Sequence, residues 1–471
     1  MKEWRTTPET SRPGVRFEEE GLRVATTIER AVNVAREYGA VPLLAEKREV
    51  TAEDARRVED FLLSAFPPDG ENYRTHSHLQ LTGEFAARIA EKLGYNPHEF
   101  RTLGLLHDAG RLLTHPEGVN PHRYFRNDGL GDVLLRKLSI PRSIREQLQP
   151  HRSYLHPEEF TSIDAFTPAQ RIVIIADICG KRKDDSTIQS LEETLEYHYA
   201  SRGSFSAAAS GPWPSENAAR KTLSTDVVKQ WGKHYEDIAA WLQREYKVDI
   251  TDVRSAIEER EKQLPVDTLV WDVGGVLILD SDPVIIRDFC HAFHLDEETL
   301  VRYWDELIPA LQRGEKSTDA FWKSFGERIE CPVTPDQRDM FTRSFDGEII
   351  PAMQSLLLQA KSKGYSLYAL SDTIPQHRDA LRQSGAYDAF EDVFLSPNLR
   401  CSKKSGSTFQ RQSELAAWRV ACLRMRKFPQ QCLFLDDKMQ YVEAAKKASM
   451  KAAQVRSPEE AEAVLRAFGI L

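Results

Sequence analysis

The segment GLLHDAG, residues 104–110, places an imidazole beside a carboxylate at the end of an apolar run. A chain of this length contains about one His-Asp pair by chance, so the pair alone predicts nothing. Eight of the thirteen histidines, however, fall within residues 76–156. An even distribution would place about two there, and the excess indicates a local chemical use.

Two further residues complete a candidate metal site. His78 lies in a predicted helix upstream, and Asp177 lies in the apolar segment IVIIADIC. With His107 and Asp108 they offer two imidazoles and two carboxylates, which suit a transition ion such as Mn, Fe, Ni, Co or Zn. Four unrelated surface groups explain the pattern less well, because a carboxylate on an apolar helix face is costly without a partner.

A second set of polar groups follows short apolar runs in the C-terminal half. The stretch VDTLVWDVGGVLILD ends its apolar run at Asp272 and continues into a Gly-rich turn. Taken alone, Asp272 is either a nucleophile or a turn residue. Three later runs end near Ser371, Lys403 and Asp436-Asp437. Because the carboxyl ends of parallel strands meet at one sheet edge, we expect these groups to converge there.

The elements expected to position these groups differ between the two halves. Up to about residue 190 apolar residues recur at helical spacing, and no stretch is typical of a sheet. After Pro265 short apolar runs alternate with amphipathic segments, which predicts a doubly wound parallel α/β sheet. A mostly helical insertion at about 283–350 is expected to form a cap over the sheet edge.

Length, charge and cysteine usage narrow the functional class. With 471 residues, the chain is expected to form two or three domains. Its net charge of −9 gives no global basic field for nucleic acid or a membrane. Six cysteines without a C-x-x-C pair and a polar, Pro-broken start predict a cytoplasmic protein without membrane contact.

The helical half resembles the HD-domain metal-dependent phosphohydrolases. The matching segments are HLQLTGEFAARIAEKLG, LGLLHDAGR and IVIIADIC, in this order, within about residues 71–190. The resemblance implies that an ion activates water for attack on phosphorus. The implied ligands are His78, His107, Asp108 and Asp177, and Asp108 is also counted as catalytic.

The same resemblance suggests substrate contacts in this half. Arg111 is expected to clamp the phosphate, and His122 and His151 are further candidates. Dinuclear members of the family carry two additional His ligands. His151 matches one of them, whereas Asn127 stands near the place of the other. One metal, or two with the oxygenase chemistry of diiron relatives, therefore remain alternatives.

The C-terminal half, about residues 265–471, resembles the haloacid dehalogenase-like (HAD-like) phosphatases. The resemblance implies that Asp272 attacks phosphorus and forms an aspartyl-phosphate. Ser371 and Lys403 would hold the transferring oxygens, and Lys404 is a further candidate for substrate binding. The implied Mg²⁺ ligands are Asp272, the Gly274 carbonyl, Asp436 and Asp437.

Three positions depart from this family pattern. Gly274 stands where most members carry a second Asp, which acts as general acid and base. Asp372 replaces an Asn, so that its charge is expected near the phosphate, and Lys404 replaces a Pro, which leaves the choice of lysine open. A general acid contributes about 10²- to 10⁴-fold. The domain is therefore expected to be either a slow phosphatase or a ligand- or partner-binding module.

The sequence thus predicts a multidomain enzyme that combines an all-α HD domain with a capped α/β HAD-like domain. The expected divisions are a helical extension at 1–70, the HD domain at 71–190, a loop and connector at 191–264, and the HAD-like domain at 265–471. Two hydrolytic sites suggest sequential trimming of a small phosphorylated substrate, including nucleotides, phosphodiesters and nucleic-acid ends. Oligomerisation stays open.

Overall fold

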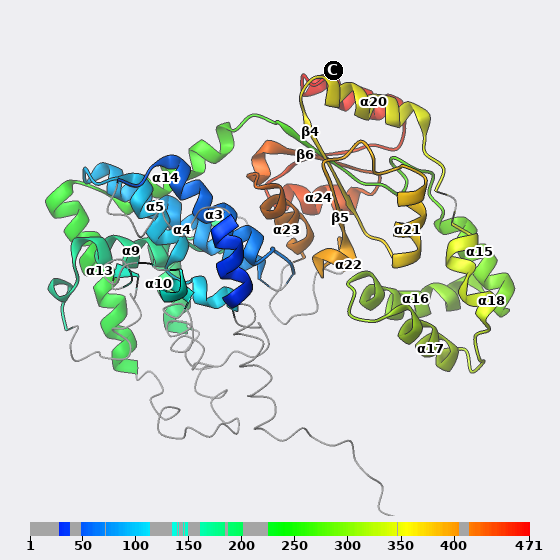
Figure 1. Cartoon of the computed structure of the whole chain (residues 1–471), viewed down its shortest axis with the longest axis horizontal. Helices are drawn as coiled ribbons and strands as arrows, with labels where there is room; N and C mark the ends of the chain where they lie inside the picture. Colours follow the sequence, from blue (N-terminus) through cyan, green and yellow to red (C-terminus); the bar gives the residue numbers. More distant parts are fainter. Residues whose placement is uncertain are drawn as a thin grey trace, which may run out of the picture. The chain divides into compact units, whose positions relative to one another are not determined.

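The computed structural model of the chain divides into two compact units (Figure 1). The described residues are 28–37, 49–70, 72–113, 134–138, 140, 145, 147–148, 161–183, 187–200, 225–345, 347–404 and 414–471. The first unit comprises Met1–Pro67, Thr75–Arg182 and Ile188–Ile257, and the second comprises Pro68–Arg74, Lys183–Thr187 and Glu258–Leu471.

The first unit is helical. Its longer helices are α3 (Ala52–Ala65), α4 (Tyr73–Lys92), α5 (Pro97–Leu106), α9 (Pro168–Cys179), α10 (Leu191–Ala200), α13 (Thr225–Tyr246) and α14 (Ile250–Gln263). Their apolar faces share one core, in which the side chains of Ile172 to Cys179 are buried. Capping boxes at Thr51 and Thr167 and prolines in the first turns of α5 and α9 explain where these helices begin.

The sequence predicts only helices up to about residue 190, and the structure differs in one place. Strands β1 (Arg182–Lys183) and β2 (Thr187–Ile188) form a two-stranded sheet. Two residues per strand are too few to leave a periodic signal in the sequence, because a strand pattern needs at least about four residues.

The second unit is built on the predicted parallel α/β sheet. Its strand order is β5-β4-β3-β6-β7, and every neighbouring pair is parallel. The strands are β3 (Thr268–Trp271), β4 (Ser366–Ser371), β5 (Asp392–Leu395), β6 (Cys432–Asp436) and β7 (Lys451–Gln454). The chain adds strands on both sides of β3, so the switch in direction lies beside the end of β3, where such sheets bind ligands.

Helices cover both faces of this sheet. Helices α20 (Pro351–Ser362) and α25 (Pro458–Ala467) pack on the face that carries Leu269 and Trp271. Helices α23 (Ala416–Met425) and α24 (Met439–Lys447) pack on the opposite face, against Val270 and Phe434. The short helix α22 (Ser396–Leu399) follows β5, and α21 (Pro375–Gln383) follows β4.

A helical insertion separates β3 from β4. It consists of α15 (Asp282–Phe293), α16 (Glu297–Gln312), α17 (Thr318–Arg328), α18 (Pro335–Arg338) and α19 (Met340–Arg343). It has an aromatic core of its own, in which Phe289 stacks on Trp322 and contacts Phe341. The predicted role of this insertion as a cap stays a prediction. Within the described ranges, we find no helix with the length and apolarity that crossing a bilayer requires.

Candidate metal centre and active site

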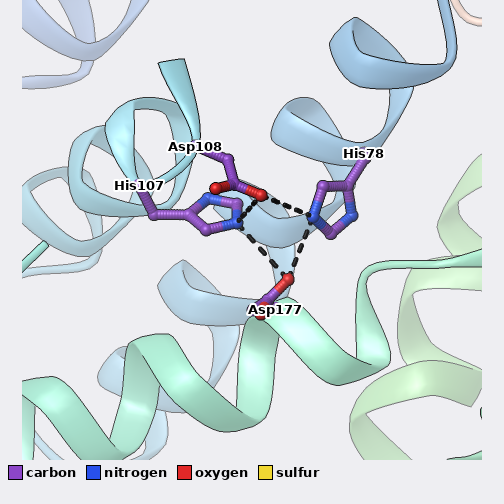
Figure 2. Close-up of side chains that lie close together, drawn as sticks. All are labelled: His78, His107, Asp108 and Asp177. Atoms are coloured by element: carbon purple, nitrogen blue, oxygen red, sulfur yellow. Dashed lines mark ion pairs between the residues drawn. The ribbon is translucent and has the colours of Figure 1, made fainter. Parts of the chain in front are cut away.

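Four side chains of the first unit converge on one point (Figure 2). Nε2 of His78 on α4 lies 3.0 Å from Oδ1 of Asp177 on α9, and Nε2 of His107 lies 3.4 Å from the same oxygen. Oδ2 of Asp108 lies 3.6 Å from Nε2 of His107 and 3.9 Å from Nε2 of His78. Ligand atoms about 2.1 Å from one ion are roughly 3 Å apart when they are adjacent. The spacing therefore fits the donor set of a single transition ion.

Backbone carbonyls orient both imidazoles toward this point. Nδ1 of His78 lies 2.8 Å from the Gly180 carbonyl, and Nδ1 of His107 lies 2.7 Å from the Gly104 carbonyl. A carbonyl only accepts, so each Nδ1 carries the hydrogen and each Nε2 keeps its lone pair. Both Nε2 atoms are buried without a hydrogen-bond partner. Their lone pairs are therefore available to a metal ion.

The electrostatics of the cluster also favour a cation. Burial opposes ionisation of Asp177, but the adjacent imidazoles of His107 and His78 outweigh it and hold the pKa of this carboxyl well below its usual range. Burial lowers the pKa of His78, against the attraction of Asp177, and so favours the neutral ring that coordinates metals. At His107, burial is outweighed by the attraction of Asp108 and Asp177, which raises the pKa of this imidazole. The two carboxylates thus favour a positive charge at the centre of the cluster.

Arg111 contacts one of these candidate ligands. Its Nε forms an ion pair with Oδ2 of Asp108 at 2.8 Å. The guanidinium is therefore in position to orient Asp108, and its predicted clamp on a phosphate remains a prediction. His122 and His151, the other predicted substrate contacts, lie outside the described residues.

Close backbone packing brings the ligand-bearing helices together. A Cβ placed on Gly104 of α5 would lie 2.6 Å from Cα of Gly83 on α4, a distance that real Cβ atoms do not reach. A Cβ on Gly180, at the end of α9, would lie 2.3 Å from Oγ1 of Thr82 on α4. Glycine is therefore needed where α4 crosses α5 and the end of α9.

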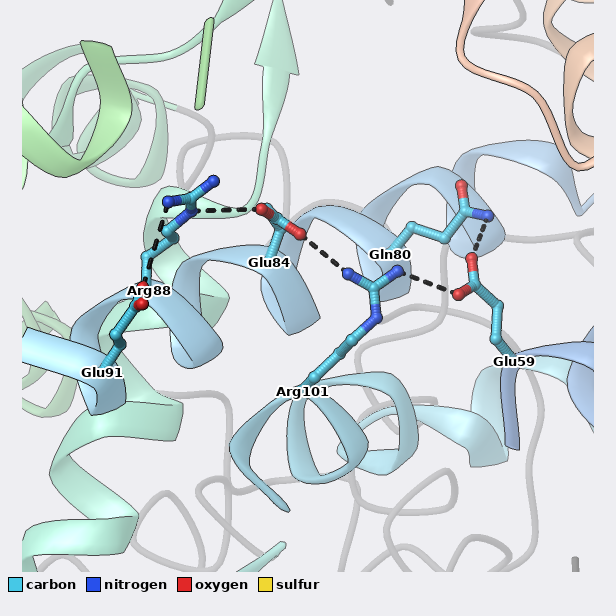
Figure 3. Close-up of polar contacts among 6 residues, drawn as sticks. All are labelled: Glu59, Gln80, Glu84, Arg88, Glu91 and Arg101. Carbon is cyan, nitrogen blue, oxygen red and sulfur yellow. Dashed lines mark hydrogen bonds and ion pairs between the residues drawn. The ribbon is translucent and has the colours of Figure 1, made fainter. Parts of the chain in front are cut away.

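A polar network also joins helices α4 and α5 (Figure 3). Arg101 of α5 donates to Glu84 of α4 at 2.7 Å and to Glu59 of α3 at 2.9 Å. Gln80 of α4 also donates to Glu59, at 2.7 Å. Arg88 of α4 extends the network through Glu84. These bonds tie α4, which carries His78, to α5, which leads into His107.

The predicted polar groups of the second unit also meet, at the carboxyl edge of its sheet. Asp272 follows β3, Ser371 ends β4 and Asp436 ends β6. Nζ of Lys403 lies 2.8 Å from Oδ1 of Asp272 and 2.7 Å from Oδ2 of Asp436. Carboxylate oxygens of Asp272, Asp436 and Asp437 lie within 4.8 Å of one another, close enough to hold one cation.

The two neighbouring lysines take different positions. The Lys403 side chain is only 2% exposed and lies between the carboxylates. The Lys404 ammonium is half-exposed and contacts Oδ1 of Asp305 on α16 at 2.6 Å. The structure thus places Lys403, and not Lys404, in the carboxylate cluster. The predicted contact of Lys404 with substrate remains a prediction.

Burial disfavours the ionised form of Asp272 in this cluster. Burial raises the pKa of Asp272 to about 8, and the Asp436 carboxylate adds to the shift, while the Lys403 ammonium acts against it. A cation bound to the carboxylate oxygens would lower this pKa and favour the ionised form of Asp272.

The Asp372 carboxylate contacts the backbone of the loop that carries Lys403 and Lys404. Its Oδ1 accepts from the backbone N–H of Lys403 at 2.8 Å, and its Oδ2 accepts from that of Lys404 at 3.1 Å. The sequence predicts only a charge near the phosphate at Asp372, and it does not signal these backbone contacts. No sequence spacing signals them, because the bonds join residues about thirty positions apart.

The two glycines after Asp272 differ in their surroundings. Gly275 has a φ of +76°, and a Cβ there would lie 2.8 Å from Oδ2 of Asp437. Glycine is required at this position by both conformation and space. A Cβ on Gly274 would meet nothing within 4 Å. The departure at Gly274 is therefore not imposed by packing.

Comparison with known proteins finds a family match within the first unit. Residues 75–180 match the family model of the HD domain. No curated protein sequence matches the chain.

Solved structures of HAD-family enzymes are similar to less than half of the chain. A HAD family enzyme, bt-2542 from Bacteroides thetaiotaomicron, shares 21% identity over 43% of this chain and 99% of its own, with a TM-score of 0.38. A structure of the same enzyme in complex with magnesium and inorganic phosphate shares 22% identity over 40% of this chain and 93% of its own, with a TM-score of 0.35. A HAD phosphatase from Thermococcus onnurineus shares 15% identity over 42% of this chain and 98% of its own, with a TM-score of 0.31.

The glycine crossing gives the first testable prediction. Gly104→Ala should lower the free energy of unfolding by about 1 to 3 kcal/mol, because its Cβ must push α4 and α5 apart. The affinity for Mn²⁺, measured by calorimetry, should fall about tenfold or more as His78 and His107 separate.

The matched control is Gly94→Ala. This glycine has a φ of +77°, and its Cβ would meet nothing within 4 Å. The control should lose about 1 to 2 kcal/mol of stability through backbone strain alone and bind Mn²⁺ normally. Unchanged Mn²⁺ affinity in Gly104→Ala would contradict the positioning role of the crossing.

The lysine pair gives the second prediction. Lys403→Met should lower the free energy of unfolding by about 3 to 5 kcal/mol, because it leaves buried carboxylates without their counter-charge. Added Mg²⁺ should restore part of this loss. Lys404→Met removes only a half-exposed ion pair and should cost no more than about 1 kcal/mol. Equal effects of the two variants in urea denaturation would refute the assignment of Lys403.

Proposed function

We propose that this chain, a hydrolase of phosphoester bonds in which an HD domain at residues 75–180 is joined to a HAD-like α/β unit, has two metal-dependent hydrolytic centres. The observation that carries the proposal is the convergence of His78, His107, Asp108 and Asp177, with both imidazole Nε2 atoms available to an ion. A second cluster of carboxylates around Lys403 supports the second centre.

At the HD centre the four residues would hold one Mn, Fe, Ni, Co or Zn ion. Such an ion, when bound, polarises the phosphate and acidifies a water molecule. The chain itself fixes the ligands: the Gly104 and Gly180 carbonyls orient the imidazoles. Arg111 holds Asp108 and is partly exposed, so it can also reach a phosphate oxygen. The four described ligands suit a mononuclear centre, and the diiron oxygenase alternative needs further His ligands, whose candidate His151 lies outside the described residues.

At the HAD-like centre Asp272 acts as the nucleophile. Its carboxylate oxygen forms a bond to phosphorus while the bond to the leaving oxygen breaks, which gives an aspartyl-phosphate. Lys403 and Ser371 stabilise the transferring oxygens, and water then hydrolyses the aspartyl-phosphate. Asp272, Asp436, Asp437 and the Gly274 carbonyl would hold Mg²⁺, which offsets the charge on the phosphate.

Gly274 limits this second activity. Without a carboxylate at this position, the leaving group lacks a donor that contributes about 10²- to 10⁴-fold. We therefore propose a slow phosphatase, with helices α15 to α19 as its cap. The specific alternative that Gly274 favours is a HAD-like unit that binds a phosphorylated ligand or a partner.

The two centres would act in sequence on one small phosphorylated substrate. The HD centre would open a nucleotide-like ester or phosphodiester, and the HAD-like centre would remove the terminal phosphate so exposed. We place this activity in the cytoplasm, which the absence of disulfides among its six cysteines supports.

A screen of phosphorylated metabolites with Mn²⁺ or Mg²⁺ tests the proposal on the wild type, His107→Ala and Asp272→Asn. His107→Ala should abolish ester opening and keep Mg²⁺-dependent release of terminal phosphate. Asp272→Asn should do the opposite, with each loss at least about 1000-fold.

Two outcomes would count against the proposal in different ways. Metal-dependent activity that survives both substitutions would refute both assigned centres. Unchanged Mg²⁺-dependent phosphate release in Asp272→Asn alone would favour the HAD-like unit as a binding module.

A further inference from the structure

A short segment upstream of the HD domain completes the core of the HAD-like unit. Pro68–Arg74 belongs to the second unit, although this unit otherwise begins its main stretch at Glu258. The side chain of Tyr73 is 1% exposed and lies in the apolar cluster that contains Leu399 and Cys401. Residues far apart in the sequence thus share one core beside the loop that carries Lys403.

The closest approach is at Gly70. Its backbone N–H donates to the carbonyl of Leu399, the last residue of α22, at 2.7 Å. This bond satisfies a carbonyl that the end of a helix leaves without a partner. A Cβ on Gly70 would lie 2.5 Å from the carbonyl oxygen of Arg400 and 3.2 Å from Cβ of Cys401. Only glycine allows the two backbones to approach so closely.

Arg424 fastens the segment to the same helix. Its Nε donates to the Pro68 carbonyl at 2.7 Å, and its Nη2 donates to the Asn398 carbonyl at 3.0 Å. Within the segment, the side chains of Asp69 and Asn72 each accept from the other's backbone N–H, at 3.1 and 3.0 Å. The backbone of Pro68 and Gly70 is therefore held against the end of α22, directly before α4 begins at Tyr73.

The loop that follows α22 is restrained at both ends, by Gly70 at Leu399 and by Asp372 at Lys403. Arg400 adopts the left-handed conformation, with a φ of +55°, which is uncommon for a residue with a side chain. Three positions later the Asp372 carboxylate accepts from the backbone N–H of Lys403. Between these two restraints the Lys403 ammonium reaches both Asp272 and Asp436.

We propose that Pro68–Arg74 is a positioning element of the HAD-like active site, because it presets the loop that places Lys403 against Asp272. The proposal rests on the phosphatase function proposed for this site. A shift of about 1 Å in a catalytic group can cost about 100-fold in rate. The HAD-like centre is therefore complete only in a chain that also contains the residues before the HD domain.

Gly70→Ala in the full chain tests this role. Amide hydrogen exchange should become about tenfold faster or more in peptides that span Leu399 to Lys403, and stay unchanged in β3. With p-nitrophenyl phosphate and Mg²⁺, kcat should fall about 10- to 100-fold with a smaller change in KM. The leaving group of this probe needs no general acid, so Gly274 does not limit the assay.

A double-mutant cycle separates positioning from general damage. If the segment acts through Lys403, Gly70→Ala should have little further effect on kcat in the Lys403→Met background. Full additivity of the two effects would overturn the proposal.

Gly364→Ala is the matched control in the same unit. This glycine has a φ of +91°, and its Cβ would meet nothing within 4 Å. The control should strain the unit but leave kcat and exchange at Leu399 to Lys403 unchanged. Arg424→Met, which removes both clamp bonds without adding bulk at Gly70, replaces Gly70→Ala if that variant does not fold.

The exchange result is independent of the proposed phosphatase activity. A wild-type protein that releases no phosphate would refute the activity, while faster exchange in the variant would still support the positioning of the loop. Unchanged exchange between Leu399 and Lys403 in the folded variant would overturn the positioning role, whatever the activity.

Discussion

Buried carboxylates that need positive charge are the constraint on which both candidate centres depend. Asp108 and Asp177 in the first unit, and Asp272 and Asp436 in the second, have side chains no more than 8% exposed. An ionised group at such depth is costly unless it is paired. The imidazoles of His78 and His107 lie against the carboxylates in the first cluster, and Lys403 supplies positive charge in the second. In each cluster, buried ligand atoms remain without a hydrogen bond, including His107 Nε2 and Asp437 Oδ1.

The burial of these groups is achieved by close backbone contacts at a few positions. Gly83 and Gly104 allow α4 and α5 to cross, and Arg101 ties the same helices together. In the second unit, Gly70 bonds to Leu399 and Asp372 bonds to Lys403, so that both ends of this loop segment are held. Both centres are therefore preorganised by their surroundings before any ion or substrate arrives, which lowers the cost of binding.

The grouping of the candidate site residues could largely be predicted from the sequence, because these residues carry local signals. The excess of histidines and the acidic residue within IVIIADIC indicate the His78 to Asp177 set. The alternation of apolar runs indicates a parallel sheet whose edge gathers Asp272 and Asp436. The contacts that position these groups could not be predicted. These contacts depend on long-range packing, which no local periodicity encodes. They are the crossing of α4 and α5 at Gly83 and Gly104, the hydrogen bond from the Lys403 backbone to Asp372, and the packing of Pro68–Arg74 in the second unit.

Crystals of the full chain soaked with Mn²⁺ test the central claim, that the buried His and Asp cluster of the first unit is a metal centre. Anomalous scattering should show one strong peak within about 2.3 Å of His78 Nε2, His107 Nε2, Asp108 and Asp177. A His107→Ala crystal, soaked in the same way, should lose this peak. A well-ordered cluster without an anomalous peak in the wild-type crystal would contradict the account.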